Sequence, residues 1–155
     1  MFTQEEFAAE VARQFQFLES EYGMRREPMH AERGRAWIGF ANAGVKVVVE
    51  VEDGTYISVT VQNLRHIKRD TLERSEFDLD EIVAASGPRQ PRRQDLRANR
   101  EGVAKAAEAL RAVGAPVLRG EFDTLHARQL KAVETLRRHD NPPLQNNEPE
   151  NGKRR

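Results

Sequence analysis

The sequence predicts an α+β domain in which an antiparallel β-meander of three or four strands is packed on one face by an N-terminal helix and by two or three later helices. Two patterns predict this fold class. Apolar residues recur every three or four positions before residue 23 and after residue 76, as in amphipathic helices. Between residues 36 and 61 they alternate with polar or mixed neighbours, as in strands with one buried face.

The segment 3–22 carries the signals of a capped amphipathic helix. Thr3 is followed three residues later by Glu6, which predicts a capping box, and Phe2 and Phe7 occupy the two positions of a hydrophobic staple. Gly23 is expected to end the helix. Its apolar stripe consists of Phe7, Val11, Phe15, Leu18 and Tyr22, and the opposite side is expected to be an acidic face of Glu5, Glu10, Glu19 and Glu21 with Arg13.

Strands are predicted at residues 36–41, 45–51 and 55–61, and a weaker pattern allows a fourth at 25–30. A three-residue loop at 52–54, with Gly54 in the left-handed conformation, would pair Val49 with Ile57. This register keeps the valines and isoleucines of both strands on one face, which we call the valine face. A register that adds Ile38 to the valine face sends Trp37 to the other side of the sheet.

The second half of the chain is predicted to form helices joined by a loop. Asp78 would cap a short helix that ends by residue 87. Asp123 would begin the last helix, which is expected to end near His139. The prolines of segment 88–100 predict a loop. The apolar stripes of the third and last helices, expected to be buried, consist of Val103, Ala106, Ala107, Leu110 and Val113, and of Leu125, Leu130, Val133 and Leu136.

We expect a single domain over residues 1–139 and a disordered polar tail over 140–155, because the tail has too few apolar residues to offset its ordering entropy. The 155 residues carry 25 basic and 25 acidic side chains, so the whole molecule has no field that attracts nucleic acid or an anionic membrane. Neither a signal peptide nor a membrane span is indicated, which predicts a cytoplasmic protein with no membrane contact.

No catalytic or metal site is predicted. The chain has no cysteine, which excludes disulfides and thiolate chemistry. The four histidines, His30, His66, His126 and His139, do not stand at the spacing of a metal-ligand motif. Neither a nucleophile motif nor a glycine-rich phosphate loop is present. We therefore expect a protein that is not an enzyme and that has no cofactor.

Two features are candidate binding sites. The first is an arginine-rich loop, whose guanidinium groups would contact the phosphates of a nucleic acid or the carboxylates of an acidic protein, or would simply be solvated. The second is the sheet face opposite the valine face, where Trp37 and Tyr56 are expected either beneath a helix or exposed to a partner. The arginines of the loop are Arg89, Arg92, Arg93, Arg97 and Arg100.

The order of the predicted elements resembles a group of small uncharacterised bacterial proteins, some of which look like immunity proteins of toxin systems. The resemblance covers residues 2 to about 138 and rests on packing and capping motifs. It implies a bacterial binding protein and assigns no functional residue. The segments that carry it are Phe17-Leu18-Glu19-Ser20-Glu21-Tyr22-Gly23, Phe77-Asp78-Leu79-Asp80-Glu81-Ile82 and Leu118-Arg119-Gly120-Glu121-Phe122.

These observations lead to two functional hypotheses. The first is a non-enzymatic protein-binding domain of immunity or inhibitor type, which would occlude a surface of its partner by charge complementarity and a few anchors. The alternative is a nucleic-acid accessory protein that uses the arginines of segment 89–100. The sequence leaves open the partner's identity and the oligomeric state.

Overall fold

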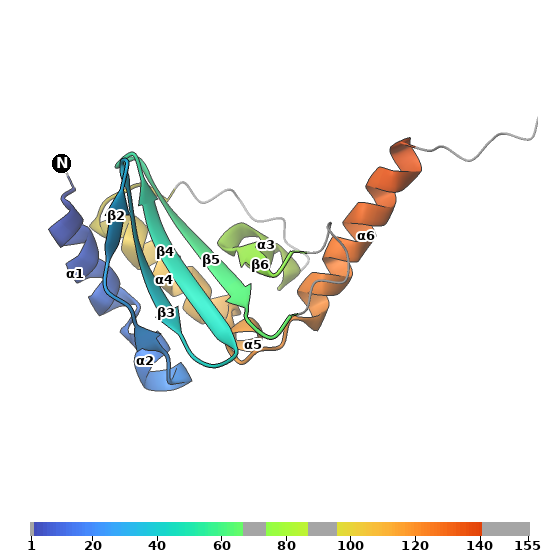
Figure 1. Ribbon diagram of the computed structural model, residues 1–155, viewed down its shortest axis with the longest axis horizontal. Coiled ribbons are helices and arrows are strands. Elements are labelled where there is room, and N and C mark those ends of the chain that lie inside the picture. Colours follow the sequence, from blue (N-terminus) through green and yellow to red (C-terminus); the bar gives the residue numbers. More distant parts are fainter. Residues whose placement is uncertain (1, 67–73, 87–95, 141–155) are drawn as a thin grey trace, which may run out of the picture.

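The computed structural model describes residues 2–66, 74–86 and 96–140, and it confirms the α+β class. Helices α1, α3 and α4 pack on one side of an antiparallel sheet, and α4 passes behind the sheet in Figure 1. The elements are α1 (Gln4–Gln14), α2 (Gln16–Tyr22), β1 (Arg25–Arg26), β2 (His30–Glu32), β3 (Arg35–Ala41), β4 (Val45–Glu52), β5 (Tyr56–Asn63), β6 (Glu76–Asp78), α3 (Leu79–Ala85), α4 (Arg100–Val113), α5 (Ala115–Leu118) and α6 (Asp123–Asp140).

The sheet is larger than the predicted meander of three or four strands. Its order is β1-β3-β4-β5-β6, and β2 also pairs with β3. The weaker pattern at residues 25–30 corresponds to two short strands, β1 and β2, on either side of Pro28, which lacks a backbone N–H. The sixth strand, β6, was not predicted. Its three residues are too few for a periodic pattern, and pairing with β5 forms it.

The predicted valine face is confirmed, but the predicted register between β4 and β5 is wrong by two residues. Val49 pairs with Val59, and Val51 pairs with Ile57. The turn therefore consists of residues 53–55, and Glu52 remains in the strand. Asp53 and Gly54 both have positive φ, 49° and 62°, and the Thr55 N–H donates to the Glu52 carbonyl at 3.0 Å. A shift of two residues preserves the side-chain alternation, so the same face stays buried.

The core lies between the valine face and the helices. Ile38 and Phe40 join this face, since they pair with Val49 and Val47, and this register places Trp37 on the other side. The fully buried side chains include residues from the sheet, from α1 and α2, and from the later helices. The largest of them are Phe7, Phe15, Phe40, Phe77, Leu18, Leu110, Leu118, Val11, Val47, Val49, Val59 and Val61.

The first helix begins and ends as predicted but is not continuous. The capping box joins Thr3 and Glu6 in both directions, and Gly23 ends α2 with φ of 63°. At Phe15 the backbone leaves the helical conformation, with φ of −97° and ψ of 11°, so α1 and α2 are separate helices. The Phe15 ring packs with Phe17 and Phe40, each at a centroid distance of 6.2 Å. The segment 4–22 contains neither glycine nor proline. The break therefore coincides with the tertiary packing of the Phe15 ring and not with a helix-breaking residue.

The later helices follow the prediction except at α5 and α6. Asp78 caps α3 by accepting a hydrogen bond of 2.8 Å from the Glu81 N–H. Gly114 and Pro116, expected only to end a helix, begin the short helix α5. The predicted burial of the α6 stripe is wrong beyond Leu125: Leu130 is 52% exposed and Leu136 is 64% exposed. Figure 1 shows the reason, because α6 leaves the body of the molecule after its first turns.

Phe40→Ala is expected to lower the free energy of unfolding by about 3–5 kcal/mol, because Phe40 is fully buried against the first two helices and the rest of the core. Urea unfolding monitored by circular dichroism measures this change. Ser58→Ala on β5, where the side chain is exposed, should change the same quantity by less than about 0.5 kcal/mol. Equal effects of the two substitutions would contradict the assignment of the buried face.

Candidate functional site

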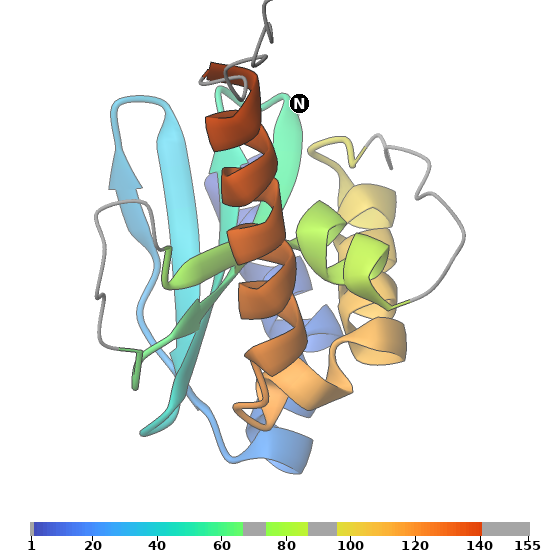
Figure 2. The ribbon, with the colours of Figure 1, turned by 90° about the vertical axis from the view of Figure 1, so that its right-hand side faces the viewer.

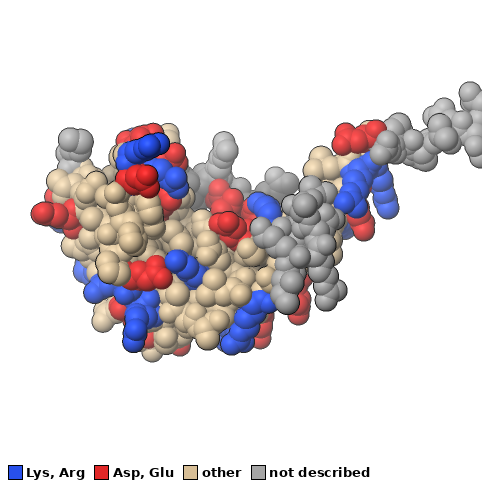
Figure 3. Space-filling view, viewed as in Figure 1, with Lys and Arg blue, Asp and Glu red and all other residues tan. Residues whose placement is uncertain are grey.

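The side of the sheet opposite the valine face carries a row of side chains that the described helices do not cover. We call it the open face. In Figure 2 the sheet lies to one side, with α3 and α4 on the other, and Figure 3 views the open face, where uncharged side chains occupy much of the middle. The pairing register assigns to the open face His30, Arg35, Trp37, Val48, Glu50, Glu52, Tyr56, Ser58 and Thr60.

Trp37 lies between two polar groups on this face. The His30 ring stacks on the indole at a centroid distance of 5.7 Å, and the Arg35 guanidinium carbon lies 5.8 Å from the Trp37 ring centroid. Arg35 in turn donates two hydrogen bonds to Glu50, at 3.0 and 2.9 Å, and these bonds raise the pKa of Arg35. These two neighbours hold the Trp37 ring in place, and because Trp37 is only partly buried, the ring still reaches solvent.

Tyr56 lies in the neighbouring row of the open face. Its side chain is 57% exposed, and its backbone pairs with Glu52 on one side and with Arg97 on the other. Segment 96–98 runs beside the start of β5, because the Ala98 N–H donates to the Thr55 carbonyl at 3.0 Å. The sequence left open whether this face is covered, and in the described part of the chain it is not.

The structure describes only two of the five arginines of the predicted loop. Arg89, Arg92 and Arg93 lie outside the described residues. Arg97 lies beside Tyr56, whereas Arg100 begins α4 and lies near Glu10, with 3.8 Å between its Nε and the Glu10 Oε1. These two arginines therefore meet different parts of the molecule.

The predicted acidic face of the first helices is partly neutralised within the fold. Glu10 is only 8% exposed and accepts two hydrogen bonds from Arg13, at 3.1 and 2.8 Å. These bonds hold the pKa of Glu10 below its ordinary value, and the charges of Arg13 and Arg100 lower it further against the effect of burial. Glu21 forms an ion pair with Arg111 of α4. The acidic face is therefore a weaker candidate for binding a basic partner than the sequence indicated.

Two histidines that are far apart in the sequence meet in the structure. The rings of His66, after β5, and His126, in α6, stack at a centroid distance of 4.3 Å, and His126 also packs edge-on against Phe77. No spacing rule reveals such a pair, because the two residues come from different elements. Across residues 2–66, 74–86 and 96–140, no group of three or more histidine, aspartate or glutamate side chains is placed to hold a metal ion.

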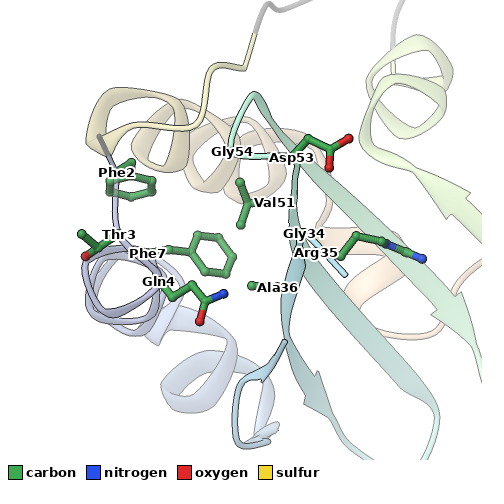
Figure 4. A pocket seen from close by; sticks show the side chains of 10 residues that line it. All are labelled: Phe2, Thr3, Gln4, Phe7, Gly34, Arg35, Ala36, Val51, Asp53 and Gly54. Carbon is green, nitrogen blue, oxygen red and sulfur yellow. The ribbon is translucent and has the colours of Figure 1, made fainter. Parts of the chain in front are cut away.

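A recess of about 370 Å³ lies between the start of α1 and the turns at Gly34 and Gly54. In Figure 4 the rings of Phe2 and Phe7 line its apolar part, whereas the Arg35 side chain points away from them. Thr3, one of its lining residues, is already paired with Glu6 through the capping box. The recess therefore presents no set of converging ionisable groups of the kind that acid–base chemistry requires.

Comparison with protein-family models, with curated proteins and with solved structures gives no match for this chain. The resemblance to immunity proteins therefore remains a prediction. No helix in the described ranges is long and apolar enough to cross a membrane. The open face, with the partly buried Trp37 and the exposed Tyr56, is the candidate functional site.

Glu10→Gln is expected to destabilise the protein near neutral pH by less than about 1 kcal/mol, since the ion pair with Arg13 is screened by solvent. The lowered pKa of Glu10 means that the ionised carboxylate contributes stability above its unfolded-state pKa, and that this contribution is lost as the pH falls through the folded-state pKa. The two proteins should therefore become equally stable at low pH.

Urea unfolding of both proteins at about pH 7 and about pH 3 measures this difference on either side of the ordinary glutamate pKa. Glu108→Gln serves as the control, because Glu108 is an exposed residue of α4. A difference between wild type and Glu10→Gln that stays the same at both pH values would show that the ion pairs of Glu10 do not stabilise the fold.

Proposed function

We propose that this protein is a non-enzymatic protein-binding domain that recognises its partner with the open face of the sheet. The observation that carries the proposal is Trp37, which is only partly buried and lies between His30 and Arg35 on the sheet. Tryptophan, tyrosine and arginine are the residue types that contribute most to binding energy at protein interfaces. The open face offers all three within neighbouring rows.

The charges of the open face support a protein partner rather than a nucleic acid. Arg35 is paired with Glu50, and Glu52 lies in the row between Arg35 and Tyr56. Carboxylates placed among the cations repel phosphates, whereas alternating charges suit the mixed surface of a protein. An inhibitor of immunity type would act here by occluding its target's surface, with Trp37 as the central anchor.

An affinity capture from the lysate of the source cells tests this proposal. We expect the tagged protein to retain one stoichiometric protein that survives nuclease treatment and moderate salt. Trp37→Ala and Tyr56→Ser should each weaken its retention about tenfold or more, because each removes an aromatic anchor that reaches solvent. Leu64→Ser is the matched control, since Leu64 is 48% exposed but lies beyond the last paired residue of β5.

Circular dichroism and urea unfolding must show that each variant keeps its fold. Recovery of nuclease-sensitive material alone, lost in steeply increasing salt, would replace the proposal with the nucleic-acid hypothesis. A captured protein that Trp37→Ala and Tyr56→Ser retain as well as wild type does would place the binding surface elsewhere on the molecule.

A further inference from the structure

A second recess lies at the end of the sheet, away from Trp37. Its volume is about 540 Å³, and its walls come from the end of α2, the β3–β4 turn, the end of β5 and the connection between α5 and α6. Four separate segments therefore build it. Among its described lining residues, Arg65 and Arg119 are the basic side chains and Glu21 is the acidic one.

Arg65 brings a guanidinium group to this recess. Its backbone N–H donates to the Asn63 side-chain oxygen at 3.2 Å, which fixes the chain as it leaves β5. The guanidinium lies against Gly44, with its Nε and Cζ 3.2 and 3.3 Å from where a Cβ at position 44 would lie. No carboxylate in the described part of the chain forms an ion pair with Arg65, although its donor groups form a fork that suits an oxyanion.

The other two charged residues of the recess, Arg119 and Glu21, form ion pairs of different strength. The Arg119 Nη2 forms an ion pair with the Glu121 Oε2 at 3.6 Å, a distance too long for a hydrogen bond. Glu21 is held by Arg111, and this ion pair offsets its charge. Arg65 therefore supplies most of the positive charge of the recess, and Arg119 keeps free hydrogen-bond donors beside its ion pair with Glu121.

Tyr22 is the aromatic residue among those that line the recess. Its ring packs edge-on against Phe17 at a centroid distance of 6.4 Å and is partly buried, so its position is fixed. Its backbone carbonyl accepts a hydrogen bond of 3.2 Å from the Asn42 side chain, which ties α2 to the β3–β4 turn. The Tyr22 hydroxyl has no hydrogen-bond partner among the described residues and is a further donor.

We propose that this recess binds a small molecule that carries a phosphate or carboxylate group beside an aromatic or apolar part. The guanidinium groups of Arg65 and Arg119 would hold the oxyanion, and the ring of Tyr22 would contact the apolar part. The site is independent of the open face and of the proposed protein partner. Because both arginines are exposed to solvent, the binding is expected to be weak, in the millimolar range.

Titrations followed by nuclear magnetic resonance test the site with four probes: phenyl phosphate, benzoate, inorganic phosphate and phenol. We expect saturable shifts of the Gly44 and Gly120 amide signals with the two aromatic anions, weaker binding of inorganic phosphate, and no saturation with phenol. Tighter binding of phenyl phosphate than of benzoate would assign the natural ligand as a phosphate ester, and the reverse order would assign it as a carboxylate.

Three variants separate a built site from general charge attraction. Arg65→Gln and Arg119→Gln should each weaken binding of the preferred probe about fivefold or more, because each removes one guanidinium. Gly44→Ala should weaken binding while leaving the charge unchanged, since the added Cβ pushes the Arg65 guanidinium aside. Lys105→Gln, on an exposed part of α4, is the control for loss of one positive charge.

Several results would overturn the proposal. They are a linear, non-saturating response to every probe, equal binding of phenol and phenyl phosphate, or equal effects of Arg65→Gln and Lys105→Gln. Unchanged amide spectra away from the recess show that each variant is folded. If Trp37→Ala abolishes partner capture and leaves these titrations unchanged, the two sites are separate, as proposed.

Discussion

The structure depends on the burial of one face of a three-stranded meander beneath α1 and α4. The strands β3, β4 and β5 each give alternate residues to the valine face, so that Ile38, Val49 and Val59 lie in one continuous row across it. Fully buried side chains of the helices, including Phe7 and Leu110, cover this face. Because side chains alternate strictly along a strand, every residue between the buried ones must point to the opposite side.

The candidate binding face follows from the same alternation. Burial of Ile38 forces Trp37 onto the open face, and burial of Ile57 does the same for Tyr56. Large aromatic side chains in such positions expose apolar surface unless another element covers them. The neighbours of Trp37 moderate this exposure, because His30 and Arg35 both lie against its ring. A fixed aromatic residue on a rigid sheet loses little conformational entropy on binding, which makes it a good anchor.

The helices also determine which charges are available to a partner. Glu10 and Glu21 look solvent-facing on a helical projection of the first segment, yet each is paired within the fold, with Arg13 and Arg111 respectively. Among the described residues, no ion pair joins Arg65, in the wall of the second recess, to a carboxylate. The Glu10–Arg13 pair is local to α1, whereas Arg111 reaches Glu21 from α4, so this second pair depends on helices that meet only in the folded chain.

The sequence alone determined the fold class, the valine face and the caps at Thr3, Gly23 and Asp78, because capping and alternation depend on residues only a few positions apart. Tertiary structure decided the β4–β5 register, since a shift of two residues buries the same face and only the turn geometry distinguishes the alternatives. It also decided the helix break at Phe15, the exposure of the α6 stripe and the contact of His66 with His126. These features depend on contacts between distant segments, which no local pattern encodes.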